Sequence, residues 1–420
     1  MRLILSDDLQ RSRGTVFFRI IFALPFLIWF VAWTIAAVCV AFVNWIATLF
    51  EGKSPTPLHD FLARYVRYST QVFAYLNLTA EPLPAFDGKP GYPVDVEIEP
   101  PVRQNRWSVG FRIVLVLPAL ALATILAGSG SFAFEGSGAE QLGFSALALT
   151  AFLGWFYAMF RGRMARGLRD LAAYALSYAG QTWSYLLLLT DRYPSSDPLT
   201  AIGPLPTRSD PVQMEVGDEL RRSRLTVFFR FALAFPHLVW LSLWGILALL
   251  AAVLSWIATI FTAVSPAWAH RFLTRYVRYQ TQVGAFLYLV GNPFPGFVGA
   301  SGKYPIELHV AEPARQNRWT VLFRLVLAFP ALLLVSVFAQ VLLVVAVLGW
   351  FYAMFTGRMP LGLRNLGAFA LRYTAQAYAY VLLLTPAYPY SGPCFEELPA
   401  PVPPPVPPTP PPAAPLPQPI

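Results

Sequence analysis

The chain has 420 residues, of which 56% are hydrophobic and only 13% are charged. Soluble domains carry about 25% charged residues, so this composition, with its long apolar runs, points to a bilayer and away from a soluble enzyme. The formal net charge is +9, but the arginines flank apolar runs instead of forming the basic face that nucleic acid requires. Two cysteines, Cys39 and Cys394, provide no disulfide framework, and the N-terminal MRLILSDDLQ lacks the apolar core of a cleavable signal.

One unit is repeated four times, at about residues 2–80, 92–194, 211–291 and 304–389. Each unit opens with an alternating stretch (RLILS, PVDVEI, PVQMEV or PIELHV) that predicts a short β-strand. A basic cluster, a long apolar run and a tyrosine-rich helical stretch follow. Units 1 and 3 share WIAT and RYVRY, whereas units 2 and 4 share RQNRW, LGWFYAMF and GRM. A two-unit module was therefore duplicated, which gives two membrane modules at residues 1–200 and 204–395, followed by a tail at 396–420.

Each apolar run is predicted to form a transmembrane helical hairpin. The runs at residues 16–50, 227–261 and 321–355 each contain 35 residues, so one helix would measure about 52 Å against a hydrocarbon core of about 30 Å. The run of unit 2, residues 109–160, has 17 more residues, and its middle reads GSGSFAFEGSGAEQ. Because such a loop cannot lie in hydrocarbon, it marks a hairpin tip. We expect tight tips at residues 29–33 and 240–244 in units 1 and 3, with re-entrant hairpins as the alternative.

Charge predicts the orientation of these hairpins. In unit 2, Arg106 precedes the apolar run and Arg163 follows it, whereas the tip contains Glu135 and Glu140 and no basic residue. Basic residues favour the cytoplasmic side of a membrane. The simplest topology therefore has eight crossings with both termini in the cytoplasm, and we expect the short strands to pair into a small cytoplasmic sheet.

The tyrosine-rich stretch that ends each unit predicts a third helix, as at residues 169–190 and 364–385. If it crossed the membrane, the RQNR and GRM arginines would lie outside, so an amphipathic helix at the interface or beside the bundle is expected, with spanning as the alternative. Tyrosine and glutamine recur at positions i, i+3 and i+7, which share one helical face. This polar stripe comprises Tyr68, Gln71, Tyr75, Tyr178, Gln181, Tyr185, Tyr279, Gln282, Tyr373, Gln376 and Tyr380. It predicts either hydrogen bonds to a lipid head group, a ligand or the partner repeat, or an interfacial helix whose polar tips meet headgroup water.

An arginine stands six residues before a proline in all four apolar runs, as in the pair Arg112 and Pro118. This inner arginine lies about 9 Å deeper along a helix than the outer arginine before it, within reach of the headgroups by snorkelling. It can serve either to fix the depth of the helix or to pair with the phosphate of an anionic lipid. The candidate headgroup-binding residues are Arg19, Arg106, Arg112, Arg163, Arg230, Arg318, Arg324 and Arg358.

Catalytic and metal-binding motifs are missing from the sequence. Apart from the tip of the second run, the apolar runs contain no Asp or Glu, which coupled transporters usually need. The polar intrusions Asn44 and Gln340 are isolated, and the lone His237 is typical of a packed residue rather than a ligand. With no nucleophile motif, phosphate loop or metal cluster, we expect no enzyme, no cofactor and no metal site.

The segments WFYAMFRGRMARGLRD (155–170) and WFYAMFTGRMPLGLRN (350–365), with the ends LLLLTDRYP (186–194) and LLLTPAYP (382–389), carry a family resemblance. The chain resembles the membrane family catalogued as domain of unknown function four-three-eight-nine, common in actinobacteria. The resemblance implies an integral protein of a bacterial inner membrane and no assigned activity. Units 1 and 3 depart from its F-T-G-R-x-P pattern, and unit 4 has Pro386 and Ala387 where unit 2 has Asp191 and Arg192.

The tail contains 13 prolines among residues 399–420 and no charge. Such a segment cannot build a core and is expected to be an extended, disordered polyproline II chain. It would act as a passive spacer or dock into the aromatic groove of a protein partner.

The predicted fold is an all-α polytopic membrane protein of four units, each with a short strand, a helical hairpin and an amphipathic helix. The expected function is a non-enzymatic membrane scaffold or lipid-interacting component whose partners are the bilayer and anionic lipids, with no nucleic acid. The alternative is a transporter of a small molecule or lipid between the two halves. A cavity there lined by Asn44, Gln340 or the polar stripe would favour transport, and a solid apolar seam would favour a scaffold. An enzyme acting on lipid ranks third, because it needs clustered His, Asp or Glu.

Overall fold

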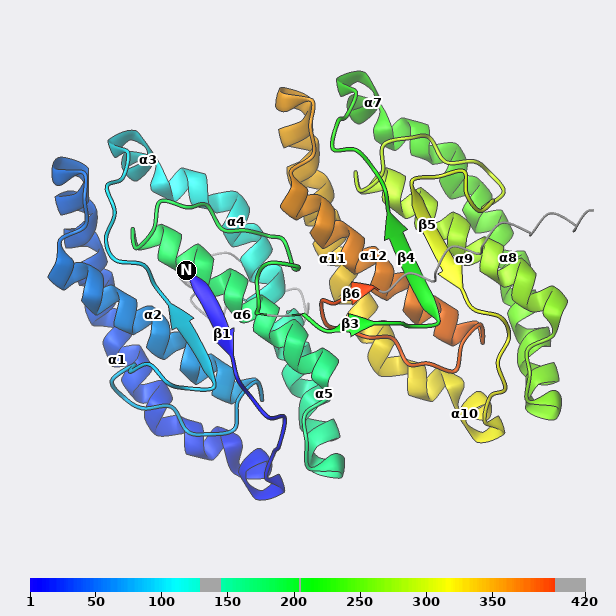
Figure 1. Cartoon of the computed structure of the whole chain (residues 1–420), viewed down its shortest axis with the longest axis horizontal. Coiled ribbons are helices and arrows are strands. Elements are labelled where there is room, and N and C mark those ends of the chain that lie inside the picture. The colour runs from blue at the N-terminus through cyan, green and yellow to red at the C-terminus, as the bar shows by residue number, and fades with distance from the viewer. Residues whose placement is uncertain (129–144, 204, 397–420) are drawn as a thin grey trace, which may run out of the picture.

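The computed structural model describes residues 1–128, 145–203 and 205–396 of a mostly helical protein (Figure 1). The first half contains, in chain order, β1 (Arg2–Leu5), α1 (Arg13–Glu51), α2 (Thr56–Leu76), β2 (Val94–Glu97), α3 (Arg106–Gly110), α4 (Arg112–Ala127), α5 (Ala146–Arg161) and α6 (Arg166–Leu186). The second half contains β3 (Thr207–Arg208), β4 (Val212–Val216), α7 (Arg224–Phe228), α8 (Arg230–Thr262), α9 (Ala267–Leu287), β5 (Ile306–Val310), α10 (Arg318–Leu322), α11 (Arg324–Thr356), α12 (Leu361–Val381) and β6 (Phe395–Glu396).

Three of the four apolar runs form one long helix each, so the predicted hairpins of units 1, 3 and 4 are wrong. Helix α1 has 39 residues, and α8 and α11 have 33 each. No turn occurs at the predicted tips, because those segments contain no polar or glycine-rich break and the helical hydrogen bonds continue past Pro25, Pro236 and Pro330. In unit 2 the apolar run is divided into α4 and α5, and the predicted tip lies outside the described residues. The predicted topology of eight crossings required a hairpin in each of the four units, so it does not hold for units 1, 3 and 4.

The tyrosine-rich stretches form the predicted helices α2, α6, α9 and α12, each of 21 residues. Each one packs against the long helix or helices of its own unit, and they also pair with one another, α2 with α6 and α9 with α12. In α6 every residue from Leu171 to Gly180 is buried. The small side chains Ala172, Ala173 and Ala175 permit close approach of neighbouring elements on all sides. These short helices therefore lie beside the long helices, as one of the two expected placements had it, and α6 is the most deeply buried of them.

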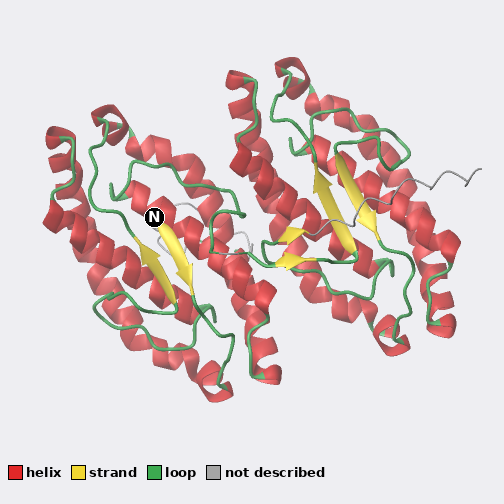
Figure 2. Ribbon diagram, viewed as in Figure 1, coloured by secondary structure: helices red, strands yellow, loops and turns green. Residues whose placement is uncertain are grey.

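The four predicted strands are confirmed, and they pair two by two. Strand β1 runs antiparallel to β2 with Leu3 opposite Val96, and β4 runs antiparallel to β5 with Met214 opposite Leu308. These four side chains are buried against the short helices, which accounts for the alternation in the sequence. A further parallel pair, β3 with β6, was not predicted, because two-residue strands have no period to detect. The strands lie in front of the helices in the view of Figure 2.

The fold has three layers: strands, short helices and long helices. The strands contact α2, α6, α9 and α12, and the long helices contact the same four short helices. One apolar core runs through both halves, because Val116 and Leu122 of α4 belong to the same cluster as Leu334 and Val337 of α11. The halves are also joined by a hydrogen bond of 2.6 Å that the Tyr390 hydroxyl donates to an Asp170 carboxylate oxygen.

Candidate functional site

The inner arginines are buried inside their own units. Arg112 and Arg324 are each 1% exposed. In every unit the guanidinium lies over an aromatic ring of the short helix, with its central carbon 4.0–4.4 Å from the ring centre. The four stacked pairs are Arg19 with Tyr75, Arg112 with Tyr185, Arg230 with Phe286 and Arg324 with Tyr380. Stacking of a desolvated guanidinium on a ring face is favourable and fixes the depth of the side chain.

Each inner arginine also donates hydrogen bonds to backbone carbonyls just beyond the end of the short helix. Arg112 Nη1 donates to the Thr190 carbonyl at 3.4 Å, and Nη2 donates to Gln104 Oε1. Arg230 Nη2 donates to the Gly291 carbonyl at 2.9 Å. A helix end leaves carbonyls without intrahelical partners and carries partial negative charge, so a cation is stabilising there.

This burial corrects the expectation that Arg19, Arg112, Arg230 and Arg324 reach lipid phosphate. Their guanidinium groups contact protein carbonyls, carboxylate or amide groups and rings instead. Within the structure, each one ties the start of α1, α4, α8 or α11 to the end of the short helix of its unit.

A second set of contacts at the end of each short helix was not predicted from the sequence. After each short helix a leucine adopts the left-handed conformation, with φ between 58° and 63°, at Leu78, Leu188, Leu289 and Leu383. Left-handed backbone costs a residue with a Cβ about 1–2 kcal/mol, so the surroundings must hold it. Each leucine carbonyl accepts a hydrogen bond from a side chain eight positions before the inner arginine of its unit: Arg11, Gln104, Arg222 or Gln316. The donor is an arginine in units 1 and 3 and a glutamine in units 2 and 4, and this regular alternation is visible in the sequence.

The polar stripe faces protein. The Tyr68 hydroxyl donates to the Phe26 carbonyl of α1 at 2.9 Å, and the Gln71 amide donates to the Lys89 carbonyl at 2.9 Å. The third position of the stripe is the ring under the inner arginine. The helical spacing of the stripe cannot reveal these partners, because they lie 42 and 18 residues away in other elements. The buried stripe members are Tyr68, Gln71, Tyr75, Tyr178, Tyr185, Tyr279, Gln282, Tyr373, Gln376 and Tyr380, and Gln181 is half-buried.

The other four candidate headgroup-binding residues, Arg106, Arg163, Arg318 and Arg358, are exposed and are the ones called outer arginines from here on. Backbone bridges join Gln10 to Arg163 and Arg221 to Arg358, so the end of one long helix lies at the start of another. Near Arg106 and Arg318 the corresponding connection is a backbone hydrogen bond, from the Gln104 N–H to the Gly52 carbonyl and from the Gln316 N–H to the Ala263 carbonyl. Each outer arginine has an exposed aromatic residue nearby in the chain: Trp107, Phe160, Trp319 and Phe355, which are 70–79% exposed. Paired basic and aromatic side chains are typical of a membrane–water interface.

Between these ends, the long helices expose most of their apolar side chains. Helix α1 buries a narrow stripe that includes Ala23, Ala37 and Thr48, while Ile20, Ile28 and most of the other large apolar residues stay exposed. Soluble monomers rarely expose contiguous apolar surface on this scale. Among the described residues, α1, α8 and α11 are long and apolar enough to cross a membrane by length and composition. These helices indicate a membrane protein.

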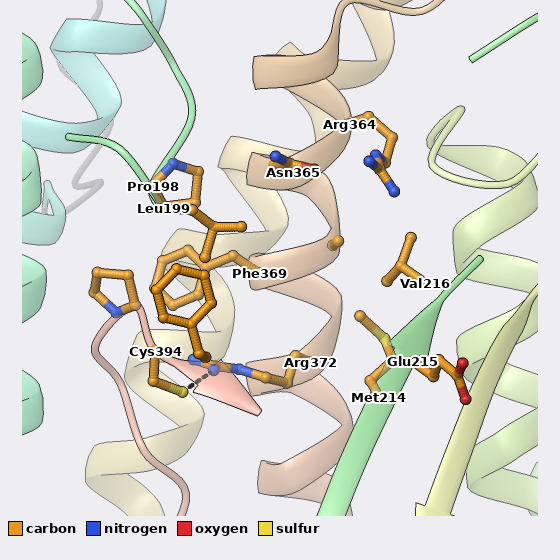
Figure 3. A pocket seen from close by; sticks show the side chains of 13 residues that line it. Pro198, Leu199, Met214, Glu215, Val216, Arg364, Asn365, Phe369, Arg372 and Cys394 are labelled. Atoms are coloured by element: carbon orange, nitrogen blue, oxygen red, sulfur yellow. Dashed lines mark hydrogen bonds between the residues drawn. The ribbon is translucent and has the colours of Figure 1, made fainter. Parts of the chain in front are cut away.

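A recess of about 470 Å³ lies on the strand side of α12 (Figure 3). Arg364 and Phe369 of α12, Glu215 of β4 and Leu199 of the loop after α6 contribute to its wall. Arg372 lies deeper, where it donates hydrogen bonds to Cys394 Sγ and to the Gly392 carbonyl. Neither Asn44, Gln340 nor the polar stripe lines it.

Asn44, one of the isolated polar residues of the apolar runs, has a structural role. It is fully buried in α1. Its amide donates to the Leu187 carbonyl at 3.1 Å, and its carbonyl oxygen accepts from the Ser54 hydroxyl at 2.6 Å. His237, the lone histidine of an apolar run, similarly lies 2.7 Å from the Tyr279 hydroxyl and stacks on Phe297. Both residues are used within the fold and bring no reactive groups together.

One family model matches the chain four times, at residues 13–87, 139–196, 224–298 and 318–391. In units 1, 3 and 4 a match covers a long helix, its short helix and the loop that follows, so the repeat inferred from the sequence agrees with the family unit. No curated protein and no solved structure matches the chain. Because the matches cover more than half of the chain, the protein belongs to the family described as a domain of unknown function, DUF4389.

Proposed function

We propose that this protein is a non-enzymatic membrane scaffold that binds lipid, with a preference for anionic head groups. The observation that carries the proposal is the exposed apolar surface of the long helices, bounded at its ends by exposed arginines with aromatic neighbours. Apolar side chains suit acyl chains, and arginines that border them suit lipid phosphate. The proposal places the protein in a bacterial inner membrane with both termini in the cytoplasm.

The packing between the halves favours a scaffold over a transporter. Where α4 and α5 meet α11, the buried cluster consists of aliphatic and aromatic side chains such as Val116, Leu122, Val337 and Phe338. A transport path would need polar groups or a channel along this seam. The recess near Arg372 lies on the strand side of α12, and Met214, Ala368 and Phe369 of the same buried cluster form part of its wall. The proline-rich tail would add a docking site for a protein partner.

The proposal is tested by replacing the four outer arginines, Arg106, Arg163, Arg318 and Arg358, with glutamine. The quadruple variant and the parent would be purified from membranes in mild detergent, and co-purified lipids would be quantified by mass spectrometry. We expect phosphatidylglycerol and cardiolipin per protein to fall at least twofold, because each basic residue near a membrane surface contributes about 1 kcal/mol of attraction to anionic lipid.

A matched control replaces four other exposed arginines, Arg2, Arg64, Arg271 and Arg275, with glutamine. This variant loses the same charge, but its substitutions lie on β1 and the short helices. We expect its anionic lipid content to match the parent's. Equal lipid content in all three proteins, or an equal loss in both variants, would refute a lipid-binding role for the outer arginines.

A further inference from the structure

The long helices are poorly suited to crossing a bilayer, although each is apolar throughout. Helix α1, with 39 residues, is about 58 Å long, nearly twice the thickness of a hydrocarbon core of about 30 Å. Its exposed apolar side chains extend from Phe17 to Phe50, so a vertical or moderately tilted helix would leave many of them in water.

Charged side chains also lie beside the middle of α1. Trp29, about 4.5 Å from the midpoint of the helix, donates its indole N–H to the Phe86 carbonyl at 2.9 Å. The next residue is Asp87, which pairs with Lys89 at 2.5 Å, and both side chains are exposed. If α1 crossed the bilayer, this ion pair would sit near its centre, where exposed charges are strongly unfavourable.

The second half repeats the indole hydrogen bond but not the ion pair. Trp240 of α8 donates its indole N–H to the Phe297 carbonyl at 2.9 Å, and the next residue is the exposed Val298. The same loop continues to the exposed Lys303 and leads into β5, where His309 lies 3.7 Å from Glu215 of β4, with side chains 42% and 53% exposed. The strand side of this half therefore also carries exposed charged residues.

Basic residues also occur at both ends of the long helices. In the first half, one end carries Arg13, Arg161 and Arg163 and the other carries Lys53, Arg103 and Arg106, all exposed. In the second half the two ends carry Arg221, Arg224 and Arg358, and Arg315 and Arg318. A spanning protein concentrates basic residues on one side of the membrane. Basic clusters at both ends instead fit an arrangement in which both ends lie at the same charged surface.

We propose that the long helices lie in the plane of one bilayer leaflet and do not cross it. In this arrangement, which rests on the membrane function proposed above, the long-helix layer contacts the acyl chains of that leaflet. Amphipathic helices bind in this way with their apolar faces about 5–10 Å below the headgroup boundary. The basic clusters meet anionic head groups at four points around the apolar surface, and the strands, including β1 and β6, face the water on one side.

Labelling from one side of sealed vesicles distinguishes the two orientations. Cysteines would be introduced at the two ends of α1 by Ser12→Cys and Glu51→Cys, both at exposed positions, in a chain with Cys39→Ala and Cys394→Ser. The full-length variant would be reconstituted in vesicles of phosphatidylcholine and phosphatidylglycerol, isolated by flotation and treated with a membrane-impermeant maleimide. Intact-mass spectrometry then counts the labels on each molecule, and labelling after detergent addition confirms that both cysteines react.

An in-plane helix gives molecules with two labels or none, according to the leaflet that each one occupies. A spanning helix gives one label on every molecule, because only one end is outside, and this result would overturn the inference while leaving the membrane function intact. Failure of the protein to float with vesicles would refute the membrane function itself.

A depth measurement tests the same inference with different variants. Single cysteines at Ile20, Ile28, Ile35 and Phe42, all well exposed on α1, would carry a fluorophore that is quenched by lipids brominated at known depths. The in-plane arrangement predicts one shallow depth for all four positions. A profile that deepens toward the middle of the helix and becomes shallow again would refute it.

Discussion

The buried Arg112 provides a direct test of whether the contacts of an inner arginine with the end of its short helix stabilise the fold. Arg112→Met keeps the length and helix propensity of the side chain but removes the guanidinium. The change abolishes the stack on Tyr185 at 4.0 Å and the hydrogen bonds to the Thr190 carbonyl and to Gln104. A hydrogen bond to a charged group contributes about 1.5–3 kcal/mol and a desolvated cation–π contact about 2 kcal/mol.

These contributions are offset in part, because a buried guanidinium is also costly to desolvate. We therefore expect a net loss of about 3 kcal/mol. At about 2–4 °C per kcal/mol for a domain of 150–250 residues, the melting temperature in detergent should fall by about 6–12 °C. Arg112→Lys should give an intermediate loss, because it keeps the charge but not the planar stack.

The control for this experiment is Arg106→Gln, which removes an exposed arginine six residues earlier and should leave the melting temperature unchanged. Melting curves followed by circular dichroism provide the measurement. A melting temperature for Arg112→Met equal to that of the parent would refute the reasoning, because the stack on Tyr185 and the hydrogen bonds of Arg112 would then contribute nothing to stability.

Three further predictions concern stability. Gly299→Ala should destabilise the protein by several kcal/mol, because its φ is +57° and a Cβ would lie 2.4 Å from the Arg275 backbone carbonyl oxygen. Gly302→Ala, at φ +71° with no atom within 4 Å of a Cβ, should destabilise it by only about 1 kcal/mol. Equal melting temperatures for the two variants would contradict this. Asn44→Ala should lose about 2–3 kcal/mol in a denaturant titration, because it leaves the Leu187 carbonyl and a serine hydroxyl buried without their partner, and a variant as stable as the parent would exclude that role. Burial lowers the pKa of His270 in the fold, so the unfolded chain takes up this proton first and stability should fall as the pH drops below about 6.5; His270→Gln should make this fall less steep, and identical pH profiles would rule the effect out.

The elements of this fold that have a local period were predictable from the sequence. Apolar and polar residues alternate in the strands that contain Leu3, Val94, Met214 and Leu308, and this period-2 pattern predicted them, although polar Asp95, Gln213 and Glu307 are buried as well. The short helices were predictable for the same reason, from tyrosine and glutamine at helical spacing. The four units were visible as repeated sequence motifs such as RQNRW and RYVRY.

The hairpin prediction fails because it requires an apolar helix to cross the membrane and return. The length of an apolar run shows whether it can cross a bilayer, but not the direction in which the helix lies. The polar insertion of unit 2 has no counterpart in units 1, 3 and 4, whose apolar runs continue as helix. The role of the inner arginines was left open for a different reason: the partner of Arg112 at Thr190 lies 78 residues away in the chain, and no local pattern reports such a contact.

The pairing of β1 with β2 has a consequence for how the chain is made. Residues 2–5 find their partner only when residues 94–97 have left the ribosome, so α1 is complete long before its unit is covered on the strand side. At that stage an apolar helix of 39 residues has only lipid or a chaperone to shield it. A nascent chain released before residue 97 would therefore present an unpaired strand edge and an uncovered helix together, and both are substrates for aggregation. Early delivery to the bilayer would thus be part of folding, and each half, not each repeat, would be the smallest piece that folds cooperatively.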